Sequence, residues 1–511
     1  MPRIRTPEDL IEEMSLKKII GQTLVLFPES ENYSDRIQKL LEDTYAGSLI
    51  FVAGGLKSAE ETRKITEDLQ RIPVNAEIGV PLFICSEHEY GLINLPPKAT
   101  PFPSNMALAA SRSVKNCYDM AFTLALELRS IGVNMNLGPT TNLNQGNDDH
   151  FGIYSFGDDA TAASKFASAF VRGLQHGGIS AVAKIFQTRH DLVPKKKVVI
   201  HHSLDILLSS ELKPLVECIR VGVDAVLIGG ASVPAIDASE VAMLSNKFTT
   251  GLLRNRFGFK GILVADLRSI DPSRLDAKKA LEAGNDLLII EESKIAQISE
   301  DILTQTRKSR IFARRVKEAA LHILRLKFKR LNRFRRPSIA TYGASLHWRL
   351  AQKIANESVT VVRNDGSIPI TKENSILIIS PKLSEVTEKG TSLLFEAMKR
   401  FGRNARDLLV SPCPTKVEVS KVIEDVKGSD KVVICSLDGH LNREYANMVK
   451  QCLEINPKAI VVSVGSPYDL NLFQAQNCLA TFGWSLPSLE AAAGVILGRL
   501  KPTGVLPIKF N

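Results

Sequence analysis

The stretch that decides the fold is GFKGILVAD, residues 258–266, in which four apolar residues lead into a carboxylate. A short apolar run that follows glycines is typical of a strand buried on both faces of a parallel sheet. In barrels of parallel strands, functional groups lie at the carboxyl ends of the strands. The stretch therefore predicts a buried strand that delivers Asp266 to an active site.

Similar apolar runs recur along the first two thirds of the chain, with helical patterns between them. The predicted strands are residues 47–52, 81–85, 133–137, 181–184, 225–228, 261–264 and 286–290, and the predicted helices include 114–131, 161–175 and 209–221. Regular alternation of strand and helix implies parallel strands, and this number of units favours a closed (β/α)8 TIM-like barrel. Lys184 and Asn136 then lie, like Asp266, at strand ends.

A second pattern begins near residue 346. It combines a helix through Asn356, strands at 359–362, 375–379, 431–435 and 459–464, and a helix at 488–498. This pattern is typical of an open α/β sandwich. We therefore predict an α/β protein with a barrel over residues 1–337, a linker over 338–345 and a sandwich domain over 346–511.

Composition narrows the class of protein. The chain has 511 residues, of which 44% are hydrophobic and 23% charged, as in ordinary globular proteins. The first 25 residues lack the apolar core of a signal peptide, and no run is apolar enough to span a membrane, so we expect a cytoplasmic protein. The seven cysteines are widely spaced without a C-x-x-C pair, and we expect no disulfide framework, metal site or cofactor.

The net charge of +10 comes from one segment. Residues Arg307 to Arg336 hold 13 Lys or Arg and one acidic residue, Glu318, and are predicted to form a helix that ends at Pro337. A local basic segment indicates an acidic protein partner, or else a solvated helix face. Nucleic-acid binding is not favoured, because no platform of stacking aromatic residues accompanies the charge.

Several motifs along the whole chain carry a family resemblance. They are MSLKKIIGQ at 14–22, ATPFPSNMALAAS at 99–111, AFVRGLQ at 169–175, VRNDG at 362–366 and GRLKPTGVLP at 498–507. Together they resemble glycoside hydrolase family 3, in its bacterial β-N-acetylglucosaminidase branch. The resemblance implies the two domains predicted above and a retaining glycosidase.

Retaining hydrolysis needs a carboxylate nucleophile and a proton donor on the other side of the glycosidic bond. By the resemblance, Val264-Ala265-Asp266 corresponds to the family's V-[ST]-D segment, which puts Asp266 in the nucleophile position. Asp266 could instead be a cap at the strand end. If Arg268 turns toward this carboxylate, it holds the carboxylate in its ionised form.

The loop that supplies the proton donor departs from the family. The motif K-H-F-x-G-H-G-D reads KIFQTRHD at 184–191, and the family's Asp–His dyad falls at Leu192-Val193-Pro194, which cannot donate a proton. His190 and Asp191 are the replacement acid/base candidates, although both also suit a solvated loop. Further candidates are His88, Glu89, His201 and His202.

Sugar-binding positions are altered as well. Lys184 is retained, but Glu87, Asn142, Tyr154 and Gly230 stand where the resemblance implies Asp, Asp, Arg and His. We take Lys184, Glu87, Tyr154 and Asn142 as the substrate-binding candidates. Change at this many positions predicts that the pocket no longer binds an N-acetylhexosamine in the family's manner.

Three functions remain open from the sequence. The favoured one is a catalytically degenerate pseudoenzyme that binds a carbohydrate or serves in assembly. The alternative is an active glycosidase with an altered acid/base and altered sugar specificity. The third is a scaffold that docks through the basic segment at 307–336.

Overall fold

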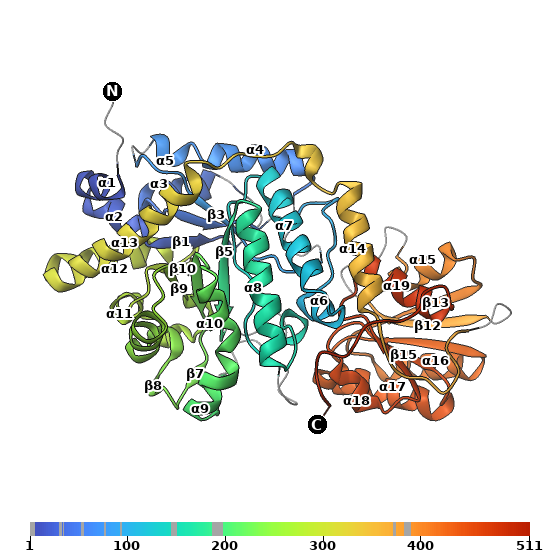
Figure 1. Ribbon diagram of the computed structural model, residues 1–511. Helices are drawn as coiled ribbons and strands as arrows, with labels where there is room; N and C mark the ends of the chain where they lie inside the picture. Colours follow the sequence, from blue (N-terminus) through green and yellow to red (C-terminus); the bar gives the residue numbers. More distant parts are fainter. Residues whose placement is uncertain are drawn as a thin grey trace. The chain divides into compact units, whose positions relative to one another are not determined.

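Eight parallel strands close into a barrel in the first part of the computed structural model (Figure 1). The structure describes residues 6–29, 33, 35–52, 56–75, 78–91, 95–144, 151–186, 198–370, 375–382 and 390–510. The strands are β1 (Leu24–Phe27), β2 (Ser48–Ile50), β3 (Phe83–Ser86), β4 (Met135–Asn136), β5 (Ser180–Ile185), β6 (Ala225–Ile228), β9 (Ile262–Asp266) and β10 (Leu287–Glu291). Their order, β1-β10-β9-β6-β5-β4-β3-β2, confirms the predicted barrel.

Helices surround this barrel. They are α1 (Pro7–Glu13), α2 (Leu16–Gln22), α3 (Asp35–Thr44), α4 (Ala59–Leu69), α5 (Ile72–Asn75), α7 (Val114–Ser130), α8 (Ala160–His176), α9 (Leu204–Ile206), α10 (Lys213–Arg220), α11 (Ala277–Ala283), α12 (Ile295–Lys308) and α13 (Arg310–Leu331). This unit also contains two π-helical segments, Leu207–Glu211 and Lys247–Arg256, and a small hairpin of β7 (Ser232–Val233) and β8 (Asp237–Val241). None of the described helices has the length and apolar character of a bilayer-spanning segment.

The barrel interior is apolar and α13 closes its amino-terminal end. Strand residues such as Val25, Val182 and Ile289 form one buried cluster with Ile323 and Leu326 of α13. The alternation of apolar residues along each strand thus fills the barrel with side chains, as in other barrels of this type.

The predicted basic helix over 307–336 is wrong in its extent. The helix is interrupted at Ser309, between α12 and α13. The Ser309 hydroxyl caps α13 by accepting a hydrogen bond from the Phe312 amide at 3.2 Å, and α13 ends at Leu331. Serine is a favoured N-cap residue, and its presence inside the basic run divides that run between two helices.

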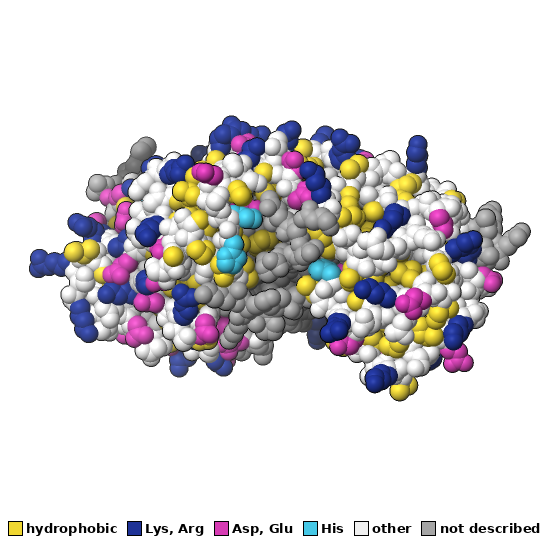
Figure 2. Space-filling view, turned by 90° about the horizontal axis from the view of Figure 1, so that it is seen from below, with side chains coloured by type: hydrophobic (Ala, Val, Ile, Leu, Met, Phe, Trp, Pro, Cys, Tyr) yellow, Lys and Arg dark blue, Asp and Glu magenta, His cyan; other side chains and the backbone are white. Residues whose placement is uncertain are grey.

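Much of the segment's charge is paired inside the first unit. Arg315 binds Asp286, and Lys329 and Arg330 both bind the buried Asp224. On the face in Figure 2, Lys and Arg side chains are interspersed with Asp and Glu. These pairs attach α13 to the barrel and leave less charge for a partner than the sequence suggests.

The second compact unit is built on a six-stranded sheet. Its strands are β11 (Thr360–Arg363), β12 (Ile376–Pro381), β13 (Ala405–Val410), β14 (Lys431–Ser436), β15 (Ile460–Ser463) and β16 (Asn477–Ala480), in the order β11-β16-β15-β14-β12-β13. Only β11 runs antiparallel to its neighbour. The predicted open α/β sandwich is therefore confirmed.

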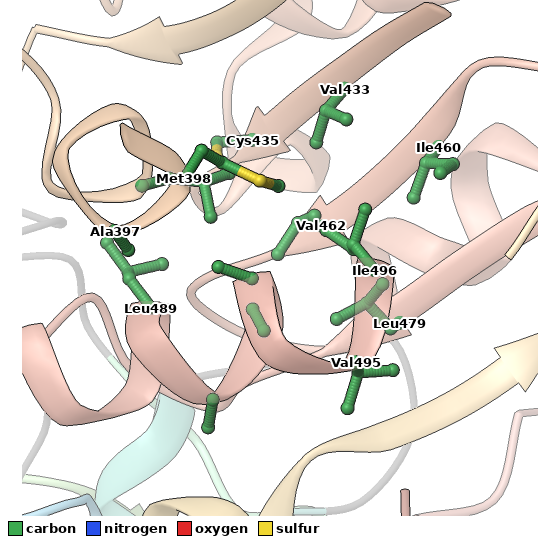
Figure 3. Packing of buried hydrophobic residues seen from close by; sticks show 14 of the residues in the cluster. Ala397, Met398, Val433, Cys435, Ile460, Val462, Leu479, Leu489, Val495 and Ile496 are labelled. Atoms are coloured by element: carbon green, nitrogen blue, oxygen red, sulfur yellow. The ribbon is translucent and has the colours of Figure 1, made fainter. Parts of the chain in front are cut away.

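Helices cover this sheet. They are α6 (Asn105–Ala110), α14 (Ser345–Ser358), α15 (Leu393–Arg400), α16 (Lys416–Lys427), α17 (Arg443–Ile455), α18 (Tyr468–Phe473) and α19 (Leu486–Ile496). Figure 3 shows strand residues Val462 and Leu479 packed near Leu489 and Ile496 of α19. Two segments from earlier in the chain, Thr100–Asn116 and Leu143–Ala162, also belong to this unit.

Candidate active site

Asp266 is the last residue of β9, and its side chain is fully buried. Arg268, two residues on, donates from Nε to Oδ1 and from Nη2 to Oδ2, each at 2.8 Å. The Arg268 amide adds a third hydrogen bond to Oδ1 at 3.2 Å. A guanidinium that binds both oxygens of a carboxylate is a strong, planar pair, and it stabilises the ionised form of Asp266.

Arg268 also binds a second carboxylate. Its Nη2 lies 2.8 Å from Oε1 of Glu87, which follows β3, and the Phe27 ring centroid lies 4.3 Å from the guanidinium carbon. Burial works to lower the pKa of Arg268, but the charges of Asp266 and Glu87 raise it above its usual value. Arg268 is therefore a permanent cation held between two carboxylates and an aromatic ring.

A second ion pair joins the ends of β5 and β3. Lys184 Nζ contacts Glu89 Oε1, and the Glu89 side chain is almost completely buried. The backbone amide and the hydroxyl of Thr140 donate to the same carboxylate at 2.7 and 3.0 Å. The retained lysine thus lies among carboxylate and hydroxyl groups, and the sequence did not indicate the part of Thr140.

Asn142 and His88 help to position loops. The Asn142 Oδ1 accepts a hydrogen bond at 2.9 Å from the amide of Phe186, a residue with a positive φ of 57°. His88 lies just beyond the end of β3, and its backbone N–H and carbonyl are hydrogen-bonded to the side chain of Asn136, the last residue of the neighbouring strand β4. Both residues are buried, and these contacts fix the backbone at the strand ends.

The structure does not test the other candidates as partners of Asp266. Tyr154 belongs to the second unit, where its carbonyl oxygen accepts a hydrogen bond from Asn105 at 2.7 Å. His190 and Asp191, the acid/base candidates, lie outside the described residues. Their roles stay predictions.

Gly230 shows how the segment after Asp266 has changed the pocket. A Cβ atom at Gly230 would lie 2.5 Å from the carbonyl oxygen of Ser269 and 2.8 Å from the Ile270 side chain. The Ser269 hydroxyl in turn donates to the Asp266 carbonyl at 2.7 Å. The backbone beyond Asp266 therefore occupies the space that a histidine at position 230 would need.

In chemical terms, the described site holds three carboxylates, each paired with a cation. Asp266 and Glu87 share Arg268, and Glu89 has Lys184. Among the described residues, no three His, Cys, Asp or Glu side chains gather as a metal site would require. The arrangement can bind polar groups, but its carboxylates are engaged with cations of the same chain.

The structure thus joins a parallel eight-stranded barrel, with acidic side chains at its strand ends, to an open α/β unit, and enzymes built on such barrels carry their functional groups at those ends. The model of the glycosyl hydrolase family 3 N terminal domain matches residues 10–326, and the chain belongs to that family.

Individual relatives agree with this assignment. The chain is similar to beta-hexosaminidase A of Pseudoalteromonas piscicida, with 22% identity over 93% of this chain and 91% of that protein. It is 33% identical to a beta-hexosaminidase of Xanthomonas campestris pv. campestris (strain B100) over 147 residues, which are 28% of this chain and 44% of that relative. The solved family 3 beta-N-acetylglucosaminidase of Paenibacillus sp. str. FPU-7 has 25% identity and a TM-score of 0.88, covering 98% of this chain and 99% of the other. The predicted family resemblance is confirmed.

Proposed function

We propose that this family 3 protein is catalytically degenerate and serves as a carbohydrate-binding or assembly protein. The observation that supports the proposal most is the position of Arg268. Its guanidinium engages both oxygens of Asp266 and is itself buried beside Glu87 and Phe27. Each oxygen of this carboxylate already accepts a hydrogen bond from the guanidinium, which competes with contact to a sugar.

Retaining hydrolysis requires that one oxygen of the nucleophile reach the anomeric carbon while a proton donor acts about 5 Å away. To free Asp266, Arg268 would have to give up at least one hydrogen bond between charged groups, each worth about 1.5–3 kcal/mol. Moving the whole guanidinium would also leave Glu87 without this partner. The ion pairs therefore favour a site that does not turn over.

A carbohydrate is the ligand we propose for this site, because the named relatives are hexosaminidases and the strand ends remain polar. About a tenth of the Lys184 side chain is exposed, while that of its partner Glu89 is almost completely buried. Paired ionic groups of this kind can hydrogen-bond to sugar hydroxyls without chemistry.

The test is hydrolysis of a panel of 4-nitrophenyl β-glycosides, including the N-acetylglucosaminide, glucoside and xyloside. We expect the unmodified protein to release no more nitrophenol than Asp266→Asn. The matched control is Asp301→Asn, which removes an exposed carboxylate from α12. Turnover that D266N abolishes and D301N preserves would overturn the proposal in favour of the second candidate, an active glycosidase with an altered acid/base, which the retention of Asp266 and Lys184 supports.

A binding measurement tests the remaining part of the proposal. We expect N-acetylglucosamine or a longer oligomer of it to bind the unmodified protein in calorimetry, and Lys184→Met to weaken that binding. If no sugar of the panel binds, the carbohydrate role is wrong and an assembly role is left.

A further inference from the structure

A cavity of about 720 Å³ lies at the amino-terminal end of the barrel, opposite the end that carries Asp266. Residues of α4, α5 and the segment after α13 line it, and in Figure 1 the chain beyond α13 runs beside α4. Gln70 and Asn134 at the cavity both bind the backbone of Leu82, which directly precedes β3. The volume is within the usual range of small-molecule pockets, roughly 300–1,000 Å³.

One side of the cavity is apolar. Its described lining includes Val80, Pro81, Leu331 and Phe334, while Val74 is 72% exposed. Exposed apolar side chains beside a concave surface often mark a binding site. A ligand with a flat apolar body fits this lining.

The other side is basic. The described lining contains three arginines, Arg63, Arg335 and Arg336, and no acidic residue. Glu67 pairs with two of them, since Arg63 Nε lies 3.2 Å and Arg336 Nη1 2.6 Å from the same Oε1. Arg335 is exposed, and the hydrogen bond of its guanidinium within the described structure goes to the carbonyl of neighbouring Phe334.

The electrostatics of this corner favour an added anion. Burial lowers the pKa of Arg336, Glu67 opposes that shift, and the nearby charge of Arg63 adds to it. Two guanidinium groups that repel each other over one carboxylate are stabilised when a further negative charge approaches. Guanidinium groups match carboxylate, sulfonate and phosphate oxygens in geometry.

The polar groups on the floor of the cavity are already used. The Gln70 amide binds both the N–H and the carbonyl of Leu82, and the Asn134 amide binds the Leu82 carbonyl and the Ile84 amide. Selectivity must therefore come from the guanidinium groups and the apolar side, since those are the lining groups with capacity left.

From this lining we infer a second ligand site, for a small aromatic anion, at the amino-terminal end of the barrel. The ring of the ligand packs on Phe334, Leu331 and Val80, and its anionic group meets Arg335 and Arg336. The site is separate from Asp266 and does not depend on whether the protein hydrolyses glycosides.

The probe is 8-anilino-1-naphthalenesulfonate, whose fluorescence rises in apolar sites, paired with N-phenyl-1-naphthylamine, which has the same rings without the sulfonate. The test variant is Arg335→Glu, and Arg333→Glu is the matched control, because it makes the same charge change at an exposed position outside the lining. We expect R335E to weaken binding of the sulfonate at least tenfold, R333E to change it less than twofold, and the neutral probe to respond less than threefold to either.

A second variant, Val74→Glu, puts a carboxylate at the exposed apolar position of the lining and is expected to weaken the sulfonate at least fivefold. It keeps the proposal testable if R335E is poorly folded by circular dichroism. Equal effects of R335E and R333E, the same response from both probes, or no saturable binding to the unmodified protein would each overturn the site.

Discussion

Asp266 and Asp286 are two buried aspartates on neighbouring strands, and each is paired with a cation of the same chain. Asp266 ends β9, and Asp286 directly precedes β10, so the two lie toward opposite ends of adjacent strands. Both side chains are fully buried. Asp286 is bound by Arg315, Arg254 and His322, while Asp266 is bound by Arg268.

The partners of Asp286 show what a buried ion pair does for this fold. At Asp286, burial alone would raise the pKa, but His322, Arg254 and Arg315 together bring it below its usual value. Such a carboxylate serves to attach α13 and the π-helical segment at 247–256 to the sheet. At Asp266 the described structure likewise shows a buried carboxylate paired with a guanidinium, that of Arg268, and the comparison predicts that this pair also serves as an anchor.

The largest expected effect is that of Asp286→Asn. Loss of this charge leaves two partly buried guanidinium groups and a partly buried imidazole without this buried partner, and we expect a loss of about 3–5 kcal/mol in the free energy of unfolding. Urea unfolding followed by circular dichroism measures it, with the exposed Asp301→Asn as control. If D286N costs no more than D301N, Asp286 is not an anchor and the comparison fails.

Arg268→Met tests whether the ion pair between Arg268 and Asp266, at the carboxyl end of β9, stabilises the fold. It leaves Asp266 and Glu87 close together without their shared cation, and we expect a loss of about 2–4 kcal/mol at pH 8. Without the cation, burial and mutual repulsion favour the protonated carboxyls, so the loss should shrink as the pH falls toward 5. Urea unfolding at both pH values measures the loss of stability, and a 4-nitrophenyl glycoside assay of the same variant shows whether hydrolysis is gained.

A gain of hydrolysis in R268M with unchanged stability would contradict the comparison. Arg268 would then be a removable cover over a working nucleophile, and Asp266 would differ from Asp286 after all. Loss of stability without hydrolysis is the result expected of an anchor.

The sequence predicted the barrel well because its strands are buried on both faces and read as apolar runs. It missed β1, since LVLF follows α2 after a single residue and the combined apolar pattern reads as one element. It also missed β13, whose first residues, Ala405 and Arg406, are polar or only partly buried because the strand lies at the sheet edge. Local pattern cannot reveal an edge.

The site was harder to predict for a different reason. The position of Asp266 at a strand end followed from the sequence pattern. Contact with Arg268 was only one possibility that the sequence allowed. The Phe27 ring above Arg268 comes from the missed strand β1, and the Thr140 contact with Glu89 joins residues 51 positions apart. Contacts between strand ends depend on barrel register, which no short motif contains.

Lys327 extends the comparison to a buried amine that has no carboxylate partner among the described residues. Its Nζ donates to Gln22 Oε1 and the Gly47 carbonyl, both at 2.8 Å, and burial lowers its pKa to about 7. The unfolded chain, with an ordinary lysine near pH 10.5, binds more protons between about pH 7 and 10.5, so stability rises with pH over that window.

Lys327→Met should therefore stabilise the protein by about 2–3 kcal/mol at pH 7, because an apolar side chain of similar length carries no charge to bury. The gain should become smaller toward pH 10. Thermal unfolding across this range measures both effects. A destabilised K327M would mean that the two hydrogen bonds outweigh the cost of burial.

Glu211 supplies the converse case and the smallest effect. It is a carboxyl that is 5% exposed, with His202 Nδ1 at 3.3 Å and no guanidinium in an ion pair with it among the described residues, and burial raises its pKa to about 7. A carboxyl whose folded pKa is raised stabilises the fold below about pH 4.5 and loses that contribution as the pH rises through 7.

Glu211→Gln, which stays neutral, should then be more stable than the unmodified protein by about 1–2 kcal/mol at pH 8 and equal to it at pH 4.5. The exposed Glu282→Gln should show no such pH-dependent gain in stability in parallel urea titrations. If E211Q is the less stable protein at pH 8, the interpretation that burial disfavours the ionised form of Glu211 is wrong.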